Sequence, residues 1–230
     1  MLPLRDLSPP GHRPLLVYAL IAANVLVFLG GPAAELERAD FVHRWGVVPF
    51  SLIEEQHWGS WVTPLTYLFL HGDLFHLLSN VWFLYVFGSN VEDVFGRLRF
   101  ALFYLACGIV AALAHVLREL GSPAAMIGAS GAIAGTLGAY VRLFPAGRVL
   151  TWIPPIFVLE LPAFFFIFVW FAKEVLRGYV FLHGPNTSGV AFFAHIGGFV
   201  AGLALVRVIG PKRYEKDGWI SPGELGRPVT

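Results

Sequence analysis

The chain has 230 residues, of which 57% are hydrophobic and only 13% are charged, and its formal net charge is +1. Soluble domains carry about 25% charged residues, so this composition excludes an ordinary soluble domain. The near-zero net charge gives no reason to expect a nucleic-acid partner, and the single cysteine, Cys107, excludes an intrachain disulfide.

Six apolar segments of roughly 20 residues each are long enough to cross the hydrocarbon core of a bilayer. They cover residues 14–30, 73–91, 98–117, 124–144, 159–180 and 189–209. The first is longer than the apolar core of a cleaved signal peptide, which is roughly 7–15 residues, so we read it as a retained helix. The sequence therefore predicts an all-α, polytopic membrane protein, with a membrane domain over residues 14–209 between the short segments 1–13 and 210–230.

The placement of Lys and Arg predicts the orientation of these helices, because cytoplasmic loops are enriched in positive charge. With the N-terminus inside, eleven of the 16 basic residues are cytoplasmic, namely Arg5, Arg13, Arg97, Arg99, Arg142, Arg148, Arg207, Lys212, Arg213, Lys216 and Arg227. The outer set is Arg38, Arg44, Arg118, Lys173 and Arg177. We therefore expect both termini in the cytoplasm, and the short loops are typical of a bacterial inner-membrane protein. The longer loop 31–60 is expected outside, either on the membrane surface or solvated.

Polar side chains within the apolar segments fall at similar depths. Counted from the outer ends at about 1.5 Å per residue, Ser130 and His195 lie roughly 9 Å down, and His76 and Asn80 roughly 5 and 10 Å. Polar groups in lipid are costly unless they have partners. We therefore expect these four side chains, from three helices, to meet in one layer in the outer half of the bilayer.

Glycines predict which helices pack closely. Segments 124–144 and 189–209 each contain two glycines four residues apart, Gly131 with Gly135 and Gly198 with Gly202. Small residues at this spacing let membrane helices approach backbone to backbone. Such packing would bring the serine and the histidine of these two segments within hydrogen-bond reach.

This pairing predicts the chemistry of a serine hydrolase. A serine becomes a nucleophile when a base takes its proton, and His195 is the best candidate base for Ser130. Glu174 reaches a similar depth, but Lys173 and Arg177 are close to it in the sequence and are expected to neutralise it. With no other carboxylate at hand, we expect a Ser–His dyad and not a triad.

An acyl-transfer site also needs donors aimed at the developing oxyanion. The candidates are the Asn80 amide, the His76 ring and the backbone N–H of Ser130. Gly128 and Gly131 would let the chain beside the serine loosen and free backbone N–H groups for this task.

These polar residues also have other interpretations. In one, each polar residue has only a structural role, and in another, His71, His76 and His195 bind a metal. The spacing of five between His71 and His76 places them on different helix faces, and no carboxylate or thiol clearly joins them, so neither a metal nor another cofactor is expected. A small-solute transporter would place its polar residues near the midplane and show repeats, whereas this polar layer is off-centre and no repeat is visible.

At these residues the chain resembles the rhomboid family of intramembrane serine proteases. The resemblance covers residues 45–209. It rests on His71-Gly72, His76-x-x-x-Asn80, Glu92-x-x-x-Gly96, Gly128-Ala129-Ser130-Gly131 and Ala194-His195-Ile196-Gly197-Gly198 with Gly202. It implies a rhomboid-like bundle of six transmembrane helices whose water-accessible site opens outward. Within it, Ser130 would be the nucleophile, His195 the general base, and His76, Asn80 and the Ser130 N–H the oxyanion site.

The resemblance also implies a substrate class and its route. Rhomboid proteases cleave single-pass membrane proteins within or beside the transmembrane segment. Substrate would enter past the fifth helix, where Trp170 and Phe171 would form a lateral gate, while His71 would order the outer loop or the mouth of the site. Relatives often carry an aromatic residue four positions after the serine, whereas this chain has Ala134, so another aromatic is expected to hold the histidine ring. The rival within the family is a catalytically inactive rhomboid-like protein that binds or escorts membrane proteins.

Overall fold

The computed structural model describes residues 1–8, 10–55, 58–183 and 192–209. Its elements in chain order are β1 Leu2–Asp6, α1 Leu15–Gly30, α2 Glu35–Trp45, η1 Ser51–Glu55, η2 Trp58–Val62, α3 Thr63–Thr66, η3 Tyr67–Phe69, α4 Leu74–Phe83, η4 Leu84–Gly88, α5 Ser89–Phe95, α6 Arg97–Arg118, α7 Ser130–Leu143, β2 Arg148–Ile153, β3 Phe157–Pro162, α8 Ala163–His183 and α9 Phe192–Ile209. The predicted tail 210–230 and the predicted start of the last helix at residue 189 lie outside the described residues.

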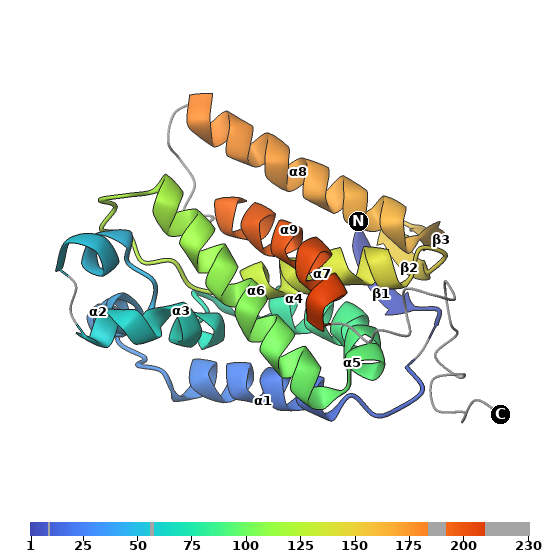
Figure 1. Cartoon of the computed structure of the whole chain (residues 1–230), viewed down its shortest axis with the longest axis horizontal. Coiled ribbons are helices and arrows are strands. Elements are labelled where there is room, and N and C mark those ends of the chain that lie inside the picture. Colours follow the sequence, from blue (N-terminus) through green and yellow to red (C-terminus); the bar gives the residue numbers. More distant parts are fainter. Residues whose placement is uncertain (9, 56–57, 184–191, 210–230) are drawn as a thin grey trace.

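The helices form a bundle around α7 and α9 (Figure 1). Among the described residues, three helical stretches are long and apolar enough to cross a membrane, namely Leu74–Phe95, Arg97–Arg118 and Phe192–Ile209. The apolar helix α1 has 16 residues, and α7 has 14 residues that are nearly all buried. The sequence predicts an all-α, polytopic membrane fold, and the structure confirms a mostly helical fold with helices that can cross a membrane.

Helix α7 begins later than the sequence predicts. Residues 124–129 do not form helix, because Met126 pairs with Val47 in an isolated antiparallel bridge and the Gly128 N–H donates to the Tyr67 carbonyl at 2.9 Å. Gly128 also has φ +117°, which only glycine adopts readily. The serine is therefore the first residue of α7, so the estimate that it lies six residues into a helix is wrong.

A small sheet closes the opposite end of the bundle from α2 and α3 (Figure 1). Its order is β1-β2-β3 with antiparallel pairing, and Leu2 faces Trp152 in the register of β1 with β2. The sequence did not predict this sheet, and β3 occupies the start of the predicted fifth segment, so that α8 begins only at Ala163. Burial raises the pKa of Asp6 at the end of β1, whose carboxylate accepts hydrogen bonds from Asn90 at 2.6 Å and from Tyr140.

A buried carboxylate ties α1 to α5. Glu92 is 3% exposed, and its two oxygens accept from the backbone N–H groups of Leu16 at 2.9 Å and Val17 at 2.7 Å. These are among the first N–H groups of α1, which have no acceptor within their own helix. Glu92 thus caps α1 from a distant part of the chain and fixes that helix against the bundle.

Candidate active site

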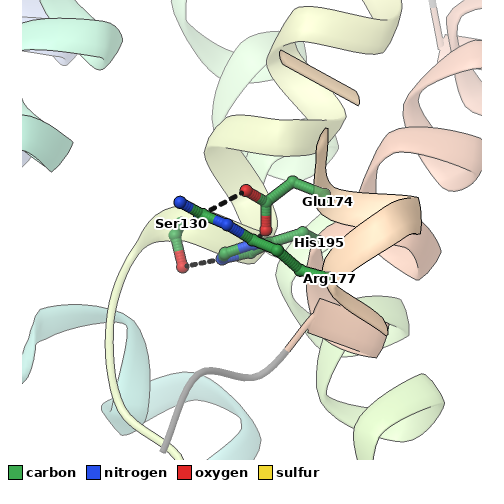
Figure 2. A network of polar contacts seen from close by, with 4 residues as sticks. All are labelled: Ser130, Glu174, Arg177 and His195. Atoms are coloured by element: carbon green, nitrogen blue, oxygen red, sulfur yellow. Dashed lines mark hydrogen bonds and ion pairs between the residues drawn. The ribbon is translucent and has the colours of Figure 1, made fainter. Parts of the chain in front are cut away.

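Ser130 lies where the non-helical segment 124–129 ends and α7 begins. It is half-buried, while the residues that follow it in the first turns of α7 are buried. As the first residue of the helix, it has an N–H that is not used in helical hydrogen bonding. Its hydroxyl lies 2.7 Å from Nε2 of His195, the fourth residue of α9 (Figure 2).

Close glycine packing brings these two residues together. A Cβ placed on Gly198 would lie 2.0 Å from the carbonyl oxygen of Gly131, and one on Gly202 would lie 1.9 Å from that of Gly135. The backbones of α7 and α9 are therefore in direct contact at both glycine pairs, as their spacing predicts. Ser130 is adjacent to Gly131, and His195 lies three residues before Gly198. The backbone contact between the two helices therefore sets the distance between the Ser130 hydroxyl and the His195 imidazole.

The other ring nitrogen of His195 also has a partner. Nδ1 lies 2.7 Å from Oε2 of Glu174 on α8, and Oε1 of that glutamate accepts from Arg177 Nη1 at 3.2 Å (Figure 2). The prediction that no carboxylate orients His195 is therefore wrong. A carboxylate has two oxygens, so the contact of Glu174 with Arg177 on the same helix leaves the other oxygen for the histidine.

An aromatic residue lies beside the His195 ring, as the small side chain of Ala134 led us to expect. It is Trp170, whose ring centroid is 6.0 Å from that of the imidazole at an interplanar angle of 41°. Trp170 and Glu174 are four residues apart and share one face of α8. The next residue, Phe171, stacks on Phe199 of α9 with centroids 4.3 Å apart. Both predicted gate residues therefore join α8 to α9 in this structure.

The predicted oxyanion residues lie on α4. A Cβ on Gly128 would be 2.7 Å from His76 Nε2 and 3.7 Å from the Ser130 hydroxyl, so the ring nitrogen and the hydroxyl border the same small space. Asn80 is 5% exposed and donates from its amide to the His76 carbonyl at 3.1 Å. Asp73 caps α4 by accepting from the His76 N–H at 2.8 Å, which fixes the helix start just before these two residues.

His71 lies behind His76. Its ring meets the His76 ring edge-on with centroids 5.0 Å apart, and the side chain is 7% exposed. Burial, and then the neighbouring His76, lower the pKa of His71 to about 4, so it is neutral at pH 7. Its place is therefore that of a support for the His76 ring. In the part of the chain that the structure describes, no group of three or more His, Cys, Asp and Glu side chains is arranged to hold a metal ion.

Sequence reasoning missed two functional candidates, Glu174 as a partner of the histidine and Trp170 as its aromatic neighbour. The signal available was a spacing of four on one helix, which places the two side chains on a common face. That spacing says nothing of which neighbouring helix the face meets. The structure settles this point by placing the face against α9.

Comparison with known proteins identifies the family of this chain. A sequence model of the family described as Rhomboid domain matches residues 58–212. The chain is similar to Rhomboid protease GluP of Bacillus subtilis, with 36% identity over 137 residues, which are 57% of this chain and 25% of that protein. It is also similar to the human presenilin-associated rhomboid-like protein, mitochondrial, with 28% identity over 197 residues, which are 81% of this chain and 46% of that protein. For rhomboid protein 1, mitochondrial, of Saccharomyces cerevisiae, the identity is 28% over 149 residues, or 63% of this chain and 41% of that protein. The matches therefore span between a quarter and about half of the length of these relatives.

Proposed function

The chain belongs to the rhomboid family, and from this premise we propose that it is an intramembrane serine protease. Ser130 is the nucleophile and His195 the general base. The observation that carries the proposal is the 2.7 Å contact between the serine hydroxyl and the histidine Nε2, made between two helices that are packed backbone to backbone. A hydroxyl and an imidazole in this relation form the minimal unit of nucleophilic acyl transfer.

The proposed reaction proceeds in two stages. The Ser130 oxygen attacks the carbonyl carbon of the scissile peptide bond while its proton passes to His195 Nε2. The tetrahedral intermediate collapses as the C–N bond breaks, and the proton on Nε2 passes to the departing amine. The acyl group then remains as an ester on the serine. Water then loses a proton to Nε2 and attacks the ester carbonyl, the C–O bond to the serine breaks, and the proton returns to the serine oxygen.

The attack on the peptide and the attack of water on the ester each form a tetrahedral intermediate with an oxyanion, and three donors are proposed to stabilise it. The Ser130 N–H is unused by α7, the His76 ring nitrogen borders the same space as the serine hydroxyl, and the Asn80 amide has a second N–H beside the one given to the His76 carbonyl. Preorganised donors of this kind stabilise charge that develops only in the transition state. Gly128 supports the set because any side chain there would displace the His76 ring.

The proposed substrates are single-pass transmembrane proteins, which reach the site from the lipid bilayer past α8. In this proposal Trp170 and Phe171 are gate residues, since their contacts with α9 must loosen for a substrate to pass between the two helices. The proposed location is a bacterial inner membrane, for which short loops are typical. The N-terminus is placed in the cytoplasm in this proposal, because that orientation puts most of the Lys and Arg residues inside. No cofactor is invoked.

A serine-directed fluorophosphonate probe tests the proposal in detergent micelles. We expect labelling of the wild-type protein and none of Ser130→Ala or His195→Ala, with the same pattern for cleavage of a model transmembrane substrate. Asn80→Ala should be slowed by roughly 100- to 1,000-fold, the usual effect of removing one oxyanion donor. A folded wild-type protein that is neither labelled nor able to cleave would contradict the proposal and favour an inactive rhomboid-like binding or escort factor.

A further inference from the structure

His195 is held from both sides of its ring. Nε2 faces the Ser130 hydroxyl and Nδ1 faces Glu174, each at 2.7 Å, so the ring lies between a helix-end serine and a buried carboxylate (Figure 2). The side chains of His195 and Glu174 are only 12% and 5% exposed. Water therefore has little access to replace either contact.

The partner on Nδ1 decides which nitrogen carries the proton. An ionised carboxylate is only an acceptor, so Nδ1 must be the N–H donor in this contact. In a neutral imidazole Nε2 is then left with a free lone pair, which is the form that can accept the serine proton. The same carboxylate faces the positive charge that develops on the ring once that proton has moved.

The glutamate itself is held by a cation. Burial disfavours a carboxylate unless it is paired, and Arg177, one turn further along α8, donates to Oε1 at 3.2 Å while its own side chain remains 54% exposed. Lys173 also interacts electrostatically with Glu174, and among the described residues His76 of α4 interacts electrostatically with His195. Arg177 thus fixes one oxygen of the carboxylate and leaves the other directed at the ring.

We infer that Glu174 is a positioning residue for the proposed protease, which keeps Nδ1 of His195 protonated and its ring aimed at Ser130. This inference rests on the proposed function of the same site. It has a structural consequence, because Glu174 and the neighbouring Trp170 both belong to α8. The base is fully oriented only while α8 lies against α9, so a substrate that enters between these helices must let α8 return before its peptide bond is cut.

Two matched variants on α8 test the inference. Glu174→Gln keeps the shape of the side chain and removes its charge, and Lys173→Gln removes a charge from the adjacent, exposed position. We expect Glu174→Gln to lower the fluorophosphonate labelling rate and kcat by about 100-fold or more, toward the roughly 10⁴-fold effect of losing the acidic member of a soluble triad. KM should change little. Lys173→Gln leaves the contacts of Glu174 with His195 and Arg177 in place, so it should lower the labelling rate and kcat far less than Glu174→Gln does. Wild-type labelling by a folded Glu174→Gln protein, while Ser130→Ala stays unlabelled, would overturn the positioning role and leave the protease proposal standing.

A second measurement does not depend on activity. In the wild-type protein with ¹⁵N-labelled histidine, the Nδ1–H of His195 should give a strongly deshielded proton signal in NMR spectra. The signal should persist in Ser130→Ala and vanish in Glu174→Gln. Its absence from the wild-type spectrum would overturn the inference directly. A wild-type protein that shows the signal but is neither labelled nor able to cleave would overturn the proposed function, and the positioning role of Glu174 in it, while the contact between Glu174 and His195 would stand.

Discussion

The contact between α7 and α9 leaves no room for a side chain at Gly198, and this makes Gly198→Ala a sharp test of how the site is built. The new Cβ would lie 2.0 Å from the Gly131 carbonyl oxygen, whereas real Cβ atoms essentially never come within 3.0 Å of another atom. The two helices must therefore separate by about 1 Å at this point. The obstacle is backbone, so no side-chain rotation relieves it.

The separation should be transmitted to the candidate active site. Ser130 is bonded to Gly131, and His195 lies one turn before Gly198, so the distance from hydroxyl to Nε2 grows from 2.7 Å to about 3.7 Å, beyond hydrogen-bond range. A misplacement of about 1 Å can lower an enzymatic rate by roughly 100-fold. Overpacking should also destabilise the fold by about 1–3 kcal/mol.

Two further glycines supply the comparison. Gly202→Ala meets the Gly135 carbonyl oxygen at 1.9 Å, one turn farther from Ser130, so it should destabilise the fold similarly but slow the reaction less. Gly178→Ala on α8 is the matched control, because its Cβ would make ordinary contacts of 3.6 Å with Phe192 and 3.9 Å with Ile196. It should retain the wild-type rate.

The assay combines the rate of fluorophosphonate labelling with thermal denaturation in micelles. Labelling is measured well below each melting temperature, so that loss of folded protein does not contribute to the rate. If a folded Gly198→Ala protein were labelled at the wild-type rate, the reasoning that helix contact sets the Ser–His distance would be refuted.

Two other predictions concern stability. Glu92→Gln removes the charge and one of the two oxygens that cap Leu16 and Val17 at the start of α1, so we expect a loss of about 1–2 kcal/mol with the labelling rate of the folded protein retained; an unchanged melting temperature would contradict this role. The pKa of His71 is lowered from its ordinary 6.5 to about 4 by burial and by His76, so between these pH values the unfolded chain binds a proton that the folded protein does not. The contribution of neutral His71 to the free energy of unfolding is therefore complete above pH 6.5 and is lost as the pH falls toward 4. The melting temperature of His71→Gln should decline less over this range, and parallel curves for the two proteins would rule the explanation out.

Much of the site was accessible from local patterns. The glycine pairs of α7 and α9 predict close packing because small residues at that spacing let apolar helices approach backbone to backbone. Because polar side chains in lipid are costly, the polar positions within the apolar segments indicate the candidate site residues, namely Ser130, His195, His76 and Asn80. The structure places the serine hydroxyl against the imidazole and the His76 ring beside both.

Other features depend on contacts between distant parts of the chain. β1 pairs with a strand near residue 150, and the late start of α7 depends on the bridge from Met126 to Val47. The alternation or apolarity of either segment alone does not identify its partner. The sequence pattern alone does not distinguish a short strand that pairs with a distant segment from an apolar stretch that forms no helix.

The sequence by itself determined the membrane class of this protein, the faces of its helices and the identity of the serine and histidine, because periodicity and the cost of polar groups in lipid are local properties. It assigned Glu174 to its nearest cations for the same reason, since Lys173 and Arg177 lie on the same helix. Only the tertiary structure decided that the second carboxylate oxygen meets His195 and that Trp170 lies beside the ring. Which helix a given face meets is set by the packing of the whole bundle, and residue spacing along one helix does not contain that information.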